Sequence, residues 1–82
     1  MSEEFDFIVY PNPLVNETTV EINNPNKTNY DLYLYDAKGS VVKSFINQTD
    51  NKIQLTGPFS KGIYNLQLTN AKVNKRKLII VE

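Results

Sequence analysis

The stretch that decides the fold covers residues 30–45 and reads YDLYLYDAKGSVVKSF. Successive side chains of a β-strand point to opposite faces, so Tyr30, Leu32 and Leu34 share one face, and more polar residues alternate with them. The segment Asp36–Gly39 predicts a hairpin turn, because aspartate bonds the turn's backbone and glycine accepts a positive φ. The apolar run that follows is the returning strand. This stretch therefore predicts an antiparallel hairpin with one buried face.

The rest of the chain repeats this pattern. Alanine occurs only at positions 37 and 71, and asparagine is scattered throughout, which disfavours helix. Short runs rich in Val, Ile, Tyr, Phe and Thr recur about every ten residues, with turn residues between them. The predicted strands are Phe5–Tyr10, Thr18–Asn23, Tyr30–Tyr35, Val41–Ile46, Asn51–Leu55, Ile63–Leu68 and Lys77–Glu82. The pattern predicts an all-β, immunoglobulin-like sandwich of about seven antiparallel strands in two sheets, with a small closed barrel as the alternative.

The alternation also predicts inward faces and domain limits. The residues expected to point inward in the other strands are Thr18, Val20, Ile22, Ile53, Leu55, Tyr64, Leu66 and Leu68. The loop from Thr56 to Gly62 contains two glycines and a proline and is expected to be a crossover longer than a hairpin turn. We expect residues 1–4 to be a short linker and residues 5–82 to form a single domain.

Composition narrows the possible functions. Nine basic and nine acidic residues cancel, so no strong field favours nucleic acid. The chain has no cysteine and no histidine, which removes thiolate zinc sites, cysteine nucleophiles and the commonest general base. Asp31, Asp36 and Asp50 match no calcium-binding loop. We therefore expect no catalytic residue, no metal, no cofactor and no small-molecule substrate.

No run of the sequence approaches the roughly 18 apolar residues that cross a bilayer. The first residues, Met1-Ser2-Glu3-Glu4, are acidic and lack the apolar core of a signal peptide. If the domain is exported, we expect a longer parent protein to supply that signal.

Three functions remain open on these grounds. A recognition or export module is one. A carbohydrate-binding or adhesive module is another, because Tyr33 and Tyr35 share the polar face of their strand and could offer aromatic rings to a sugar. The third is a purely structural sandwich beside an enzyme. A sugar-binding module predicts an exposed, coplanar tyrosine pair.

The order of the motifs narrows the choice. The segments are YPNP (residues 10–13), TTVEI (18–22), YDLYLYDAKGSVVKSF (30–45), IQLTG (53–57), KGIYNLQL (61–68) and KLIIV (77–81). In this order they resemble the type A C-terminal sorting domain of type IX secretion substrates in Bacteroidota, the Por secretion tail family. The resemblance covers about residues 7–82. It implies a non-catalytic signal that directs a cargo, N-terminal to it in a parent protein, through the type IX translocon. It also implies passage through the periplasm to the cell surface or beyond, often followed by removal by a surface sortase.

The resemblance assigns two groups of residues by position. The residues expected to maintain the fold are Asp36, Gly39, Gly57, Gly62 and Tyr64. The residues expected to contact the export machinery are Pro11, Asn12, Pro13, Lys75, Lys77, Leu78, Ile79, Ile80 and Val81. The family loop usually has a leucine soon after its glycine, where this chain has Pro58-Phe59. If the last strand lies at a sheet edge, its free backbone groups could pair with a receptor strand.

Overall fold

The structure, a computed structural model, describes residues 6–13 and 16–82. The predicted linker 1–4 and Phe5 lie outside the described residues, so the domain boundary stays a prediction. The strands are β1 (Asp6–Tyr10), β2 (Glu17–Asn23), β3 (Tyr30–Tyr35), β4 (Val41–Gln48), β5 (Lys52–Thr56), β6 (Gly62–Thr69) and β7 (Asn74–Val81). All seven predicted strands are present, and the described residues contain no helix.

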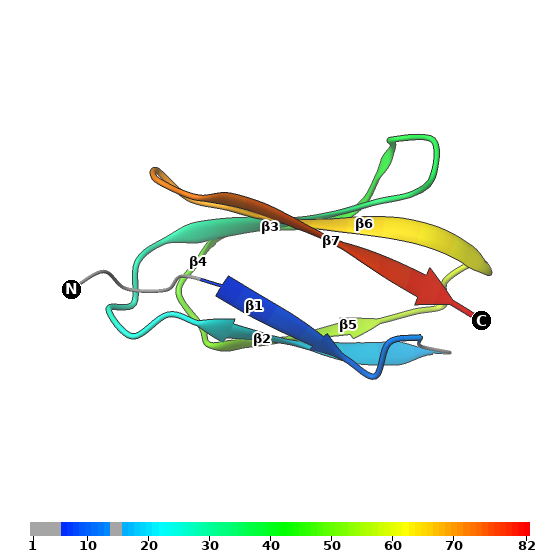
Figure 1. Cartoon of the computed structure of the whole chain (residues 1–82), viewed down its shortest axis with the longest axis horizontal. Coiled ribbons are helices and arrows are strands. Elements are labelled where there is room, and N and C mark those ends of the chain that lie inside the picture. The colour runs from blue at the N-terminus through cyan, green and yellow to red at the C-terminus, as the bar shows by residue number, and fades with distance from the viewer. Residues whose placement is uncertain (1–5, 14–15) are drawn as a thin grey trace.

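The strands form two facing sheets, seen edge-on in Figure 1. One sheet has the order β1-β2-β5 and the other has the order β4-β3-β6-β7. All neighbouring strands are antiparallel. The two sheets do not close into a barrel, so the predicted two-sheet sandwich is confirmed. Edge strands β1 and β7 run along the same side of the molecule (Figure 1).

Each sheet turns one face toward the core, as the alternation predicted. The buried hydrophobic residues are Phe7, Val20, Ile22, Tyr30, Leu32, Leu34, Ile53, Leu55, Tyr64, Leu66, Leu68, Ile79 and Val81. All the predicted inward residues are buried, including Thr18 among the polar ones. This single cluster, contributed by both sheets, is the hydrophobic term that holds two thin layers together. Four partly buried side chains pack against this cluster: Val9, Phe45, Phe59 and Val73.

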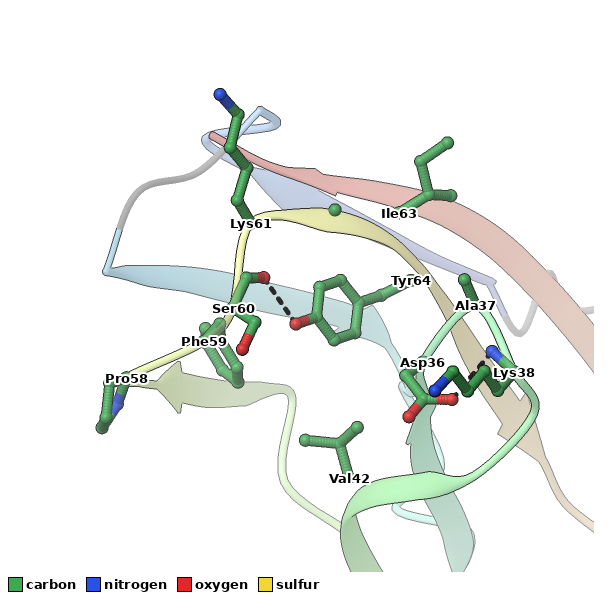
Figure 2. A pocket seen from close by; sticks show the side chains of 11 residues that line it. Asp36, Ala37, Lys38, Val42, Pro58, Phe59, Ser60, Lys61, Ile63 and Tyr64 are labelled. Atoms are coloured by element: carbon green, nitrogen blue, oxygen red, sulfur yellow. Dashed lines mark hydrogen bonds between the residues drawn. The ribbon is translucent and has the colours of Figure 1, made fainter.

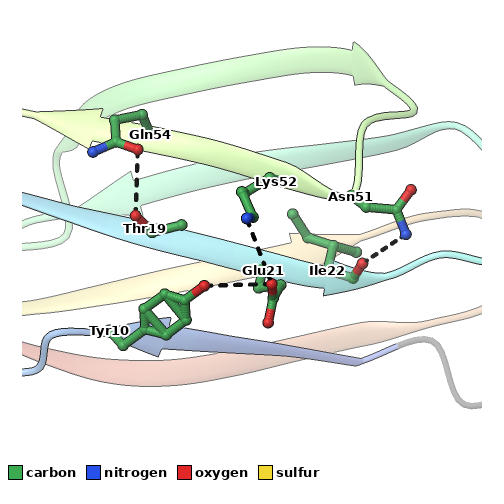
Figure 3. Close-up of polar contacts among 7 residues, drawn as sticks. All are labelled: Tyr10, Thr19, Glu21, Ile22, Asn51, Lys52 and Gln54. Atoms are coloured by element: carbon green, nitrogen blue, oxygen red, sulfur yellow. Dashed lines mark hydrogen bonds and ion pairs between the residues drawn. The ribbon is translucent and has the colours of Figure 1, made fainter.

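The outer face of the three-stranded sheet is polar (Figure 3). The Tyr10 hydroxyl donates to Glu21 Oε2 at 3.3 Å, and Lys52 Nζ lies 3.9 Å from the same carboxylate oxygen. Thr19 Oγ1 donates to Gln54 Oε1 at 3.3 Å. Each of these exposed cross-strand pairs contributes little to the free energy of unfolding. Because the polar side chains stay in contact with solvent on this face, the opposite face of the sheet is the one that packs against the core.

The chain changes sheet between β4 and β5. In a constant-type immunoglobulin sandwich the fourth strand belongs to the same sheet as the fifth, whereas here β4 pairs with β3. The connection through residues 49–51 is held by side chains from the facing segments. Asn24 Nδ2 donates to the Thr49 carbonyl at 3.2 Å, and the Tyr30 hydroxyl donates to the Asp50 carbonyl. Asn51 Nδ2 donates to the Ile22 carbonyl at 3.1 Å (Figure 3).

The last strand differs most from its predicted limits. It begins at Asn74, three residues before the predicted start at Lys77, so Lys75 and Arg76 lie within the strand rather than ahead of it. The apolar run is also not uniformly buried. Ile79 and Val81 are buried, but Leu78 and Ile80 are exposed. β6 is as long as β7 and pairs with it along its whole length, which extends the last strand through polar residues.

Candidate functional site

The terminal strand lies at the edge of the four-stranded sheet, which is the condition that the sequence argument set for pairing with a receptor strand. β7 pairs with β6 on one side only. Ile79 and Val81 point into the core, and they are 1% and 3% exposed. Removing residues 77–82 would therefore remove part of the core as well as an edge, so that deletion is not a clean test of recognition.

The segment Pro11–Pro13 follows β1 directly and lies on the surface. The Tyr10–Pro11 and Asn12–Pro13 peptide bonds are cis. Thr18, itself 1% exposed, donates its hydroxyl to the Pro11 carbonyl at 2.8 Å. This bond attaches the segment to β2 and so fixes its position.

Asn12 joins this segment to the terminal strand. Its Nδ2 donates to the Leu78 carbonyl at 3.1 Å, and its Oδ1 accepts from the Ile80 N–H at 3.1 Å. Both backbone groups lie on the edge of β7 that faces away from β6. The two segments that the sequence argument selected separately, 66 and 68 residues apart, thus form one surface. The edge that was expected to be free is occupied at this point by a side chain of the same protein.

Two lysines of β7 also contact β1. Lys75 Nζ lies 3.7 Å from Asp6 Oδ1. Lys77 Nζ lies 5.4 Å from the centroid of the Phe7 ring, a distance suited to a cation–π contact. Both side chains therefore span the gap between the two sheets. Arg76 alternates with them and belongs to the outer face, opposite Gln67 of β6.

The outer face of β6 and β7 carries an apolar group at the same end. Ile63 of β6 is the register partner of Ile80, and Leu78 lies two residues before Ile80 on β7. Their side chains are 51%, 39% and 53% exposed. We call Asn12 together with Ile63, Leu78 and Ile80 the Asn12–β7 surface. It combines an exposed apolar group with an edge of β7 whose backbone groups at Leu78 and Ile80 are bonded to Asn12.

The residues expected to maintain the fold lie elsewhere. Asp36 Oδ1 accepts from the backbone N–H groups of Lys38 and Ser40, both at 2.9 Å. Gly39 donates to the Asp36 carbonyl at 3.0 Å and has φ +91°, a region that L side chains rarely occupy. The β3–β4 turn therefore depends on an aspartate at its first position and a glycine at its fourth.

Gly57 lies in the β5–β6 connection, and Tyr64 of β6 is bonded to that connection. A Cβ on Gly57 would lie 2.7 Å from the Phe59 nitrogen and 3.0 Å from the Asn16 carbonyl oxygen, so this position excludes larger residues by close approach. Tyr64 donates its hydroxyl to the Ser60 carbonyl at 2.6 Å, four residues upstream. This is the tyrosine-corner arrangement of immunoglobulin-like sandwiches.

Phe59 packs edge-on against Tyr64, with ring centroids 6.1 Å apart. Figure 2 shows these rings in an open surface pocket between the β3–β4 turn and the β5–β6 connection. Asp36, Gly62 and Tyr64 all line it. Gly62 has φ +153°. The pocket brings together residues that shape the two connections.

The tyrosine pair is not a flat platform. The rings of Tyr33 and Tyr35 are 6.1 Å apart and tilted by 35°. Both are partly buried, and the Tyr35 hydroxyl donates to Gln67 Oε1 at 3.0 Å. The exposed, coplanar pair required by the sugar-binding alternative is therefore not formed.

Across residues 6–13 and 16–82, no three acidic, histidine or cysteine side chains are grouped so that they could hold a metal ion. Nor does that part of the chain contain a helix long and apolar enough to span a membrane.

Sequence reasoning selected both halves of the Asn12–β7 surface but not the link between them. A proline-flanked asparagine gives no sign of its partner, because the partner is backbone far along the chain. Thr18 and Asn24 were also missed as anchors. Both are buried polar residues in an Asn- and Thr-rich sequence, where composition does not distinguish a buried side chain from a turn residue.

Comparison with known proteins adds two findings. The family model described as "Secretion system C-terminal sorting domain" matches residues 8–82. A curated relative, described as an endo-acting ulvan lyase of Formosa agariphila, is 33% identical over 78 residues. The match covers 92% of this chain and 15% of that protein, so the chain spans a small fraction of the relative's length.

Proposed function

Since this chain belongs to the family of secretion system C-terminal sorting domains, we propose that the export machinery recognises it at the Asn12–β7 surface. The domain is a C-terminal sorting signal for type IX secretion and is non-catalytic in itself. Such a signal implies export to the cell surface or the extracellular space.

The finer steps belong to the proposal. The cargo is a domain N-terminal to this one, in a parent protein that carries a signal peptide and passes through the periplasm. A component of the type IX translocon binds the folded sandwich there, and a surface sortase acts on the parent afterwards. The relative of this chain is described as a lyase, which fits a sorting domain attached to an enzyme that works outside the cell.

One observation carries the choice of surface. Asn12 makes two hydrogen bonds to the edge of β7 and so joins two segments from opposite ends of the described chain. A surface assembled this way exists only in the folded domain. A partner that binds it distinguishes the folded from the unfolded sorting domain, and the proline-bounded segment loses little conformational freedom on binding.

The test changes exposed side chains without touching the core. In a cargo fusion, Leu78→Thr with Ile80→Thr is expected to reduce export at least severalfold, because apolar contacts at an interface centre carry much of its affinity. Threonine keeps the strand propensity of β7, so the fold should survive. The measurement is the amount of cargo outside a Bacteroidota host, compared with the amount retained in the cells.

The matched control is Val41→Thr with Ile46→Thr on β4, at the opposite edge of the same sheet. Val41 and Ile46 are 55% and 53% exposed, comparable to Leu78. This control is expected to leave export unchanged. Equal export from both double variants would show that the Asn12–β7 surface is not the recognition site.

A further inference from the structure

Among the described residues, the side chain of Asn12 bonds to the edge of β7 that faces away from β6. The Leu78 carbonyl and the Ile80 N–H point away from β6, and each is bonded to the Asn12 carboxamide at 3.1 Å. These are the groups that a neighbouring strand would use to extend the sheet, because backbone groups on one side of a strand pair with the next strand. The amide of Asn12, with one donor and one acceptor in use, takes the place of that strand's backbone.

An edge of this kind associates readily when it is open. β7 is eight residues long and ends in an aliphatic run, and Leu78 and Ile80 are exposed beside the edge. Long edges with apolar side chains pair with other strands unless a charge, a proline, a bulge or a covering group prevents it. Here Asn12 is the covering group at the most apolar part of β7.

We propose that the β7 edge is a strand-pairing site for a second copy of this chain, and that Asn12 keeps it closed. The partner is argued from the register. In an antiparallel pair of β7 strands, aligning Leu78 with Ile80 of the other copy also places Arg76 opposite Glu82. Twofold symmetry makes each contact twice. Opposite charges and apolar pairs directly across a ladder stabilise it, so this register is complementary in both respects.

Two Asn12 side chains must be displaced to form one such dimer. Each makes two exposed hydrogen bonds, whose loss is expected to weaken pairing by roughly tenfold for each copy, or about a hundredfold for the dimer. The inference concerns the chain itself and does not rest on the export function.

The experiment measures self-association by sedimentation equilibrium for the wild-type chain, Asn12→Ala and Asn29→Ala. Asn29 is an exposed asparagine of the β2–β3 loop and serves as the control. Asn12→Ala is expected to dimerise with a dissociation constant at least tenfold lower than wild type, whereas Asn29→Ala is expected to match wild type. A second variant, Asn12→Asp, keeps an acceptor for the Ile80 N–H but has no donor for the Leu78 carbonyl at neutral pH. Its dissociation constant is expected to lie between those of Asn12→Ala and the wild type. Circular dichroism confirms that each variant is folded.

Charge reversal tests the register. In the Asn12→Ala background, Arg76→Glu places two like charges opposite each other and is expected to weaken the dimer at least tenfold. Adding Glu82→Arg reverses the pair and is expected to restore it. Amide hydrogen exchange at Ile80 reports whether the edge is open. A folded Asn12→Ala that stays as monomeric as wild type would overturn the proposal. Unchanged exchange at Ile80 in Asn12→Ala at concentrations where it is monomeric would also overturn it, as would a dimer insensitive to Arg76→Glu.

Discussion

Replacing Asn24 with alanine is expected to lower the free energy of unfolding by roughly 2–4 kcal/mol. Asn24 is fully buried. Its Nδ2 donates to the Thr28 carbonyl at 2.9 Å and to the Thr49 carbonyl at 3.2 Å. Its Oδ1 accepts from the Thr28 N–H at 3.0 Å and the Thr28 hydroxyl at 2.9 Å. Every hydrogen-bonding position of the side chain is therefore used.

The size of this effect follows from what Asn24 holds. Its bonds close the loop between β2 and β3 and attach this loop to the β4–β5 connection. Both of these segments carry the chain between the two sheets. A domain of this length is stable by only about 4–12 kcal/mol, so the loss is a large share of the total. Urea denaturation measures it, with Asn29→Ala in the same loop as the control, expected within about 0.5 kcal/mol of wild type. Equal midpoints for Asn24→Ala and wild type would contradict the role assigned to this side chain.

Raising the pH from 10 to 12 is expected to destabilise the protein through Tyr30 by roughly 2–3 kcal/mol. Burial, and secondly the charge of Asp50, raises the pKa of Tyr30 from 10.0 to about 12. The unfolded chain loses this proton near pH 10, whereas the folded protein holds it until about pH 12. Protons are thus released on unfolding in this window, and stability present below pH 10 is lost as pH rises through it.

Comparison with Tyr30→Phe isolates this contribution. Phenylalanine cannot ionise, while the lysines and the other tyrosines titrate in both proteins. Near neutral pH the variant is expected to be less stable by about 1 kcal/mol, because the bond from the hydroxyl to the Asp50 carbonyl is lost. Between pH 10 and 12 the stability of wild type should fall more steeply. Parallel pH profiles for the two proteins would contradict the raised pKa of Tyr30.

The fold was largely predictable because its local signals agree with its packing. Alternation in β2, β3, β5 and β6 predicted which residues are buried. Aspartate and glycine in the Asp36–Gly39 turn predicted the hairpin, since each meets a local backbone requirement. Periodicity and turn chemistry are properties of neighbouring residues, so a sequence displays them directly.

What could not be predicted depends on contacts between distant residues. β7 extends back to Asn74 because β6 offers it a partner of equal length, and the polar residues 74–76 give no local signal of a strand. The bonds from Asn12 to β7 and from Asn24 to Thr49 are likewise long-range and use side chains typical of turns. Tertiary pairing decided these positions over local propensity.

These features together describe a domain whose proposed recognition surface is a product of its folding. The anchors at Asn24 and Tyr30 hold the crossing between sheets, while Thr18 and Asn12 position the proline-bounded segment against β7. Substitutions at the first pair are expected to act on export only through stability. Substitutions of Leu78 and Ile80 are expected to act on export with the fold intact. Measuring unfolding and export on the same variants separates the two effects.

The most direct test of the sorting function fuses this chain to the C-terminus of a fluorescent cargo that carries a signal peptide. The cargo is expressed in a Bacteroidota host with an intact type IX translocon and in a matched strain whose translocon is inactive. We expect cargo at the cell surface or in the medium of the first strain and retention inside the second. Equal amounts outside both strains, or equal export of the cargo without this chain, would contradict the account.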